Sequence, residues 1–235
     1  MIPVVAGIAG LLLGPMLHGW AVQAGVDHDL HLAFACPRCG EEGDLLSARC
    51  TCGRVRWREL SLAALVGAAF GGFASTLGPR PVLIAHLAMA AVTAMLIVTD
   101  LDHFRIPNSL LYPGSLACFI LLGVGTAFEN AWPSLIRGLI GAGIYFGLLL
   151  LVFLAARGEG FGFGDVKLAG LLGLFTAYAS YRILAWGLII TALLGGIPAV
   201  VLLAMGRGKK AAIPYGPPLI LGAWSAIIFS HQILG

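Results

Sequence analysis

Long apolar runs separated by short polar segments dominate this chain. All but the sixth, which is short, have the ~17–25 mostly apolar residues that cross a bilayer as a helix. We identify eight of them: residues 2–24, 60–77, 82–99, 109–128, 134–156, 166–179, 183–205 and 215–234. The pattern predicts an all-α protein, a polytopic membrane helix bundle of about eight transmembrane helices.

One polar segment is long enough to form a small domain of its own. It extends over residues 25–59 and contains four of the five cysteines. We therefore expect three parts: a first transmembrane helix at 1–24, a cytoplasmic Cys-rich loop at 25–59 and a seven-helix membrane domain at 60–235.

The composition agrees with a membrane location and gives the bundle an orientation. Of the 235 residues, 59% are hydrophobic and 11% are charged, whereas soluble domains have about 25% charged residues. If the loop at 25–59 is cytoplasmic, its side of the membrane carries eleven of the 14 Lys and Arg residues, as the positive-inside rule requires. Both termini are then outside, and the net charge of +3 needs no nucleic-acid partner.

Two acidic residues lie at the ends of apolar runs, where a charge is costly and is a functional candidate by default. Asp100 follows the third run, and Asp165 precedes the sixth after a glycine-rich stretch. Two runs separate them, so the chain crosses the membrane and returns, which places both at the cytoplasmic face. Each alone could simply cap a helix. Together on one face, they favour a catalytic pair.

The residues around the two acids predict where the helices begin and end. Glycines at positions 160, 162 and 164 disfavour helix, so we expect the sixth helix to begin after Asp165. Pro107 pushes the residue before it out of helical geometry, so the third helix should end near Asp100. Their charged neighbours fit solvated or interfacial side chains: Asp102, Arg105 and Lys167.

The four cysteines of the polar loop lie in two short turns, Cys36-Pro37-Arg38-Cys39 and Cys50-Thr51-Cys52. Four thiolates suit tetrahedral zinc, and a cytoplasmic location disfavours disulfides. Because the second pair is one residue tighter than a zinc knuckle, reduced thiols without metal are the alternative. We expect structural zinc at Cys36, Cys39, Cys50 and Cys52; four cysteines would leave no open position for catalysis.

From Thr99 to its end, the chain resembles the prepilin peptidases, also called type IV leader peptidases, which are membrane aspartic proteases. Their Gly-x-Gly-Asp motif followed by Val-Lys-Leu matches Gly162–Leu168. Their first acid stands seven residues before a Pro that is followed by Asp or Asn, as Asp100 stands before Pro107-Asn108. Ile213–Pro218 is similar to the family's Pro-aromatic-Gly-Pro element at the start of the last span.

The resemblance implies an endopeptidase that removes the short basic leader from type IV prepilins or type II secretion pseudopilins. It places the active site at the cytoplasmic face of the bacterial inner membrane, makes residues 60–235 the peptidase domain and makes Asp100 and Asp165 catalytic. The remaining motif residues are assigned to substrate binding: Gly162, Gly164, Lys167, Pro107 and Asn108. The expected partners are these substrates and the lipid bilayer, and the oligomeric state stays open. Proteolysis needs no cofactor.

A second activity is often present in family members that carry the cysteine loop. They methylate the new N-terminal amine with S-adenosylmethionine. This chain departs from the family pattern in Leu17–Gln23 and in the tighter second cysteine pair. The resemblance therefore leaves N-methylation open.

Other functions are compatible with two acids at a membrane boundary. A presenilin-like protease also uses Gly-x-Gly-Asp, but its first acid usually follows a Tyr, where this chain has Thr99. A proton- or ion-coupled transporter could use Asp100 and Asp165 as ion-binding groups, but it predicts acids nearer the bilayer midplane. An inactive scaffold that only holds prepilins is a further alternative.

Overall fold

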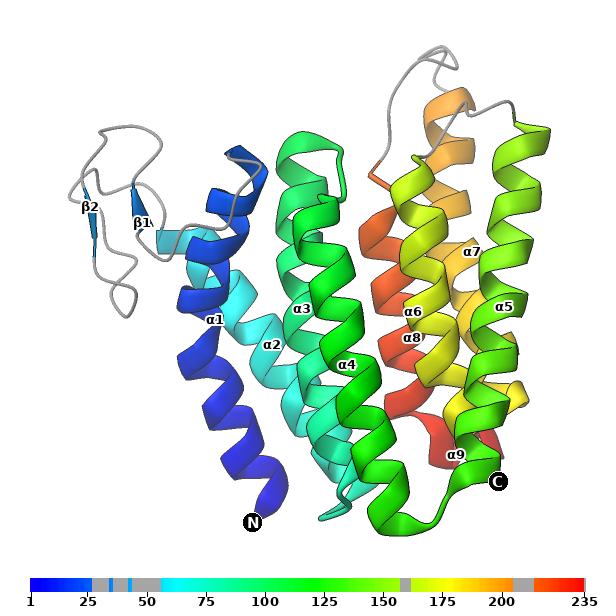
Figure 1. Cartoon of the computed structure of the whole chain (residues 1–235). Coiled ribbons are helices and arrows are strands. Elements are labelled where there is room, and N and C mark those ends of the chain that lie inside the picture. The colour runs from blue at the N-terminus through cyan, green and yellow to red at the C-terminus, as the bar shows by residue number, and fades with distance from the viewer. Residues whose placement is uncertain (27–33, 36–41, 44–55, 157–161, 205–213, 235) are drawn as a thin grey trace.

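The computed structural model describes residues 1–26, 34–35, 42–43, 56–156, 162–204 and 214–234 (Figure 1). Within these residues the chain is almost entirely helical. The helices are α1 (Ile2–Val26), α2 (Arg56–Leu77), α3 (Val82–His103), α4 (Asn108–Glu129), α5 (Trp132–Ala155), α6 (Phe163–Ala179), α7 (Tyr181–Ala204), α8 (Gly216–Ile228) and α9 (Ser230–Leu234). Two short antiparallel strands, β1 (Phe34–Ala35) and β2 (Glu42–Gly43), pair Phe34 with Gly43.

Helices α1 to α8 run alternately up and down, so every second loop lies at the same end of the bundle (Figure 1). Five of the described helices, α1 to α5, are long and apolar enough to cross a membrane by length and composition, and α7 and α8 contribute shorter apolar segments. The expected fold class, a polytopic membrane helix bundle, is confirmed. Both chain ends lie at the end of the bundle opposite the point where α3 and α5 end (Figure 1).

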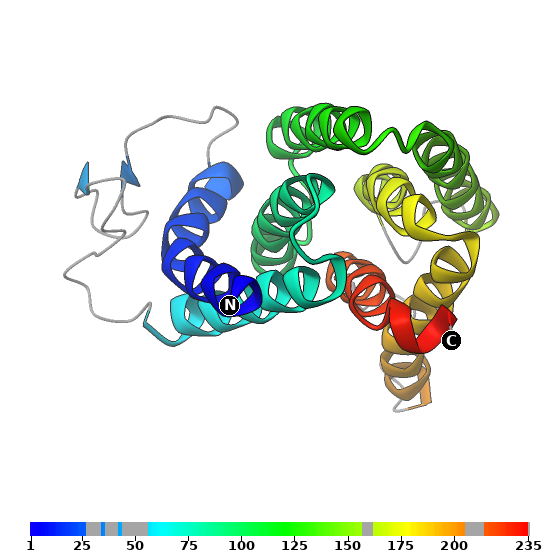
Figure 2. The same ribbon diagram turned by 90° about the horizontal axis from the view of Figure 1, so that it is seen from below.

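Seen along the helices, the bundle has two parts (Figure 2). Helices α1 to α4 form one part, in which α1 packs on α2 and α3 packs on α4; in the other, α5 packs on α6 and α7 packs on α8. The two parts meet mainly through α8, which packs on α2, α3 and α6. Helices α4 and α5 follow each other in the chain but contact each other little.

The core lies around α3 and α6. Both helices bury small and aliphatic side chains over most of their length, whereas α5 leaves an apolar face exposed that suits lipid contact. Glycines bring α5 and α6 close together. A Cβ on Gly141 would lie 2.1 Å from the Ala177 Cβ, and one on Gly173 would lie 2.6 Å from the Gly141 oxygen. Small residues of this kind let membrane helices pack backbone to backbone.

Two expected helix boundaries are wrong. Helix α3 continues past Asp100 to His103 and ends at Phe104, whose left-handed φ of 52° lets its N–H bond the Asp100 carbonyl oxygen. Helix α6 begins at Phe163, so Asp165 lies inside its first turn and not before it. The reason is a helix cap that the number of glycines does not reveal. The Asp165 carboxylate accepts a hydrogen bond of 2.9 Å from the Gly162 N–H and so stabilises the first turn of α6.

The expected division into parts at 1–24, 25–59 and 60–235 stays a prediction. Helix α1 extends to Val26 and α2 begins at Arg56, so each helix reaches slightly into the predicted loop. The four cysteines of that loop, Cys36, Cys39, Cys50 and Cys52, lie outside the described residues.

Candidate active site

Asp100 lies near the end of α3 and is buried, with 4% of its surface exposed. Its Oδ2 accepts a hydrogen bond of 2.9 Å from the N–H of Gly216, the first residue of α8. That N–H belongs to the first turn of a helix, where amide hydrogens have no partner within the helix. The carboxylate is therefore bound to a second helix 116 residues further along the chain.

Asp165 is equally buried, also with 4% of its surface exposed, in the first turn of α6. Its Oδ2 accepts the Gly162 N–H, while its Oδ1 has no hydrogen-bond partner among the described residues. A buried carboxylate oxygen without a partner is costly. Its presence here makes Asp165 a candidate for chemistry.

The two carboxylates lie near enough to interact electrostatically, although they belong to different parts of the bundle. Asp100 is near the end of α3 and Asp165 is in the first turn of α6; the end of α3 and the start of α6 lie at the same end of the bundle (Figure 1). The side chain of Tyr215, just before α8, also interacts with Asp165. Two neighbouring buried carboxylates cannot both ionise easily, so such a pair shares a proton.

Two glycines allow the backbone to close around the acids. A Cβ on Gly216 would lie 2.8 Å from the Asp100 Oδ2, and a Cβ on Gly164 would lie 2.9 Å from the Ile106 Cβ. Both distances are too short for a side chain without a shift of the neighbour. Glycine at 164 thus lets α6 pack against the turn after α3, and glycine at 216 lets α8 reach Asp100.

The other predicted motif residues meet beside the acid pair. Lys167 of α6 donates from its Nζ to the Asn108 Oδ1 at 2.9 Å, across to the first residue of α4. The same ammonium lies 5.0 Å from the Tyr112 ring centre and 5.1 Å from that of Phe163. Pro107 precedes α4 in an extended conformation. Lys167 therefore joins α4 and α6, and its expected role as an interfacial anchor stays a prediction.

Residues 87–204 match the family model described as the type IV leader peptidase family. This stretch is half of the chain and contains both acids. The chain belongs to the type IV leader peptidase family. The resemblance noted from its motifs is confirmed, and so is the expected enzyme class, a peptidase. The family match gives no support to a transporter.

Curated relatives agree with this family. The chain is 30% identical to the prepilin leader peptidase/N-methyltransferase of Pseudomonas aeruginosa over 85% of its own length and 72% of the relative's. It is 29% identical to the protein of that name from Aeromonas salmonicida, over 84% of this chain and 72% of the relative. It is also 29% identical to the protein of that name from Stutzerimonas stutzeri, over 57% of this chain and 45% of the relative. No solved structure matches the chain.

Asp102, which follows Asp100 by two residues, does not join the acid pair of this leader peptidase family member. Its carboxylate lies 2.6 Å from the Arg58 guanidinium of α2, and its side chain is 19% exposed. His18 of α1 is buried nearby and interacts with both of them. These contacts make Asp102 part of an ion pair with Arg58, a partner that the prediction of a solvated interfacial side chain did not include.

Motif reasoning left two residues of this site without a role, Tyr215 and Gly216. The sequence signal was present, because Pro214-Tyr215-Gly216-Pro217 begins the last apolar run and is similar to a family element. The contact between Gly216 and Asp100 could not be predicted from the motif, because the two residues are far apart in the sequence.

Proposed function

We propose that this chain is an aspartic endopeptidase that removes the leader from type IV prepilins or type II secretion pseudopilins, with Asp100 and Asp165 as its catalytic pair. The observation that carries the proposal is the pairing of two buried carboxylates from α3 and α6, one of which has an oxygen without a partner. Family membership supports a peptidase, and curated relatives are named for prepilin leaders.

The mechanism follows from one proton shared by two carboxylates. The ionised member takes a proton from water as the water oxygen attacks the scissile carbonyl, and the protonated member donates to the developing oxyanion. When the C–N bond breaks, the leaving amine takes the proton that the first acid removed from water, and a hydroxyl of the tetrahedral intermediate returns a proton to the second acid. The products are a carboxylic acid and a new N-terminus. Each acid has one oxygen bound by a backbone N–H, from Gly216 or Gly162, which leaves its other oxygen for water or substrate.

The assignment of roles within the pair rests on helix geometry. Asp165 lies in the first turn of α6, where the helix dipole favours a negative charge. Asp100 lies near the end of α3, where the dipole disfavours a negative charge, but it also accepts the first N–H of α8, whose dipole favours one. Asp165 thus has only a favourable helix end beside it and Asp100 has one of each kind, so we assign the ionised, water-activating role to Asp165 and the proton-donating role to Asp100.

The location belongs to the same proposal. The bias of Lys and Arg toward the loops on the acid-bearing side supports a bacterial inner membrane protein with its active site at the cytoplasmic face and its termini outside. Single cysteines placed near Met1 and Asn130 test this orientation. Both should react with a thiol reagent added outside intact cells, and failure of both to react would contradict it.

Zinc at Cys36, Cys39, Cys50 and Cys52, and methylation with S-adenosylmethionine, stay separate proposals. The P. aeruginosa relative is named as an N-methyltransferase as well as a peptidase. Metal analysis of the purified protein, compared with a double Cys36→Ser, Cys52→Ser variant, tests the zinc site. Loss of zinc together with retained cleavage would assign the metal to structure or to methyl transfer.

The central experiment is incubation of purified protein with a prepilin, followed by mass spectrometry of the product. Loss of the leader mass reports cleavage, and an additional methyl mass reports the transferase. We expect Asp100→Asn and Asp165→Asn each to abolish cleavage while the protein still inserts. Processing by both variants at the wild-type rate would show that the acid pair is not catalytic.

A further inference from the structure

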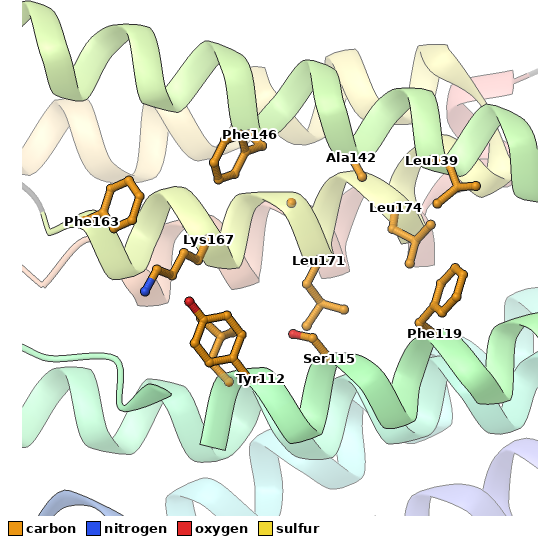
Figure 3. A pocket seen from close by; sticks show the side chains of 12 residues that line it. Tyr112, Ser115, Phe119, Leu139, Ala142, Phe146, Phe163, Lys167, Leu171 and Leu174 are labelled. Carbon is orange, nitrogen blue, oxygen red and sulfur yellow. The ribbon is translucent and has the colours of Figure 1, made fainter. Parts of the chain in front are cut away.

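A groove lies between the two parts of the bundle, beside the acid pair. It has a volume of about 480 Å³ and is bounded by α4, α5 and α6 (Figure 3). Apolar side chains form most of its walls, among them Phe119, Phe146 and Leu171, which face the hollow from the three helices (Figure 3). The groove is open on one side, since Tyr112 and Phe119 are 56% and 39% exposed.

The groove begins at the level of the acids and continues into the membrane-spanning length. On α6 its wall extends from Phe163 to Leu174, which is about 16 Å at 1.5 Å per residue. Asp165 lies on the opposite face of that helix, because it is two residues from both Phe163 and Lys167. Groove and acids therefore approach each other only at the start of α6, around Gly162 and Gly164, which carry no side chains, with Ile106 packed against Gly164.

The walls suit a helix. One small residue from each helix lines the hollow, namely Ser115, Ala142 and Gly170, and small residues allow close approach of a helix backbone inside a membrane. A peptide occupant at this depth must be helical, because its backbone groups find no water there. An acyl chain of a lipid gains nothing from small wall residues of this kind.

Charge gives the occupant a direction. Among the described residues that line the groove, only Lys167 is charged, and it lies at the end nearest the acids. A positive charge there repels a basic leader and attracts a carboxylate. The occupant thus has its basic segment beyond the acid pair, its apolar segment along the groove and an acidic side chain near the first turn of the apolar segment.

We propose that this groove binds the apolar helix of the substrate that continues from the scissile bond into the bilayer, with a carboxylate of that helix on Lys167. The proposal rests on the proposed function, because that function supplies a substrate cut at the acid pair. It adds where the uncut remainder of the substrate binds, and it makes α4 and α5 part of substrate selection.

Photo-crosslinking tests the occupant directly. A photoreactive phenylalanine is placed at Phe119 in the groove or, as a control, at Ile120, which is 54% exposed and does not line the groove. Both carry Asp165→Asn and are mixed in vesicles with a precursor made of a basic leader and an apolar helix of about 20 residues. We expect the precursor to crosslink at least about tenfold more at 119. Equal yields at 119 and 120, or lipid adducts alone at 119, would overturn the proposal.

Filling the groove gives an independent measurement with active protein. Ala142→Trp places an indole in the groove, whereas Gly143→Trp places it one residue further on the same helix, where a Cβ meets nothing within 4 Å. We expect Ala142→Trp to lower kcat/KM for the precursor about tenfold or more and Gly143→Trp to change it less than about twofold. Wild-type rates for Ala142→Trp would contradict the groove.

The two experiments separate this proposal from the proposed function. Crosslinking at position 119 without cleavage by the wild-type protein would keep the groove and reject the peptidase mechanism. Cleavage that is insensitive to Ala142→Trp and accompanied by no preferred crosslink would keep the peptidase and reject the groove.

Discussion

The N–H of Gly216 donates to the Asp100 Oδ2 at 2.9 Å, and a Cβ at position 216 would lie 2.8 Å from that same oxygen. The start of α8 therefore both orients the first acid and leaves no room for a side chain. The position of Asp100 depends on a residue 116 positions away.

Replacing Gly216 with alanine tests this dependence. We expect Gly216→Ala to displace the Asp100 carboxylate and lower kcat by roughly a hundredfold, because a 1 Å misplacement of a reacting group can cost about that much. Cleavage of a prepilin by purified protein measures the effect. Gly123→Ala, where a Cβ meets nothing within 4 Å, is the matched control and should cleave normally. Normal cleavage by Gly216→Ala would mean that Asp100 tolerates a different position.

Asp165→Asn is expected to raise the thermal stability of the protein while it abolishes cleavage. The asparagine oxygen can still accept the Gly162 N–H, so the helix cap is kept, and one buried charge beside Asp100 is removed. We expect Tm in detergent to rise by about 2–4 °C, equivalent to about 1 kcal/mol in a protein of this size. If Asp165 served only as a helix cap, its replacement would not raise Tm. A lower Tm for Asp165→Asn would therefore contradict the view that the buried charge of Asp165 destabilises the protein.

Asp102→Asn should leave most of the cleavage activity intact. Asp102 is paired with Arg58; the Arg58 side chain is 64% exposed and that of Asp102 is 19% exposed. With the cation in water the pair is screened, and such pairs contribute only about 0–1 kcal/mol. We expect kcat/KM to change by less than about fivefold, measured in parallel with Asp100→Asn. A loss as large as that of Asp100→Asn would show that the second acid of this motif takes part in the reaction.

Arg137 is expected to be a major stabilising residue of the α5–α6 pair. Its guanidinium donates to the carbonyl oxygens of Ala177, Tyr178 and Ala179, the last residues of α6. Each charged hydrogen bond of this kind contributes about 1.5–3 kcal/mol. Arg137→Met should therefore lower the free energy of unfolding by about 2–4 kcal/mol.

The matched control for this loss is Arg182→Met. Arg182 is exposed and has a single long bond, of 3.3 Å, to the Leu234 carbonyl oxygen, so we expect a change below about 0.5 kcal/mol. Denaturant unfolding in the same detergent measures both variants. Equal losses would mean that the α6 carbonyls find other donors when Arg137 is removed.

The hydrophobic pattern was enough to predict the bundle and to place Asp100 and Asp165 at the same end of it. Alternation of the spans fixes the side of every loop, and each apolar run leaves little choice of secondary structure in a membrane. The local rule that glycine disfavours helix failed at Gly164. The Asp165 carboxylate caps the helix, so α6 begins at Phe163, two residues before Asp165.

The contacts that complete the site could not be predicted from the sequence in the same way. The bond between Asp100 and Gly216 depends on how α3 packs on α8, and the groove depends on how little α4 contacts α5 and α6. Both are consequences of packing between helices that are distant in the chain or turned away from each other. Neither leaves a periodic signal in the residues.

The contribution of α8 to Asp100 also sets an order of events during synthesis. Asp100 enters the membrane on α3, Asp165 follows on α6, and the N–H that orients Asp100 arrives only with α8. A nascent chain that ends before Gly216 has both acids but lacks the group that aligns one of them. On the proposed mechanism, proteolytic competence is therefore acquired only when α8 docks.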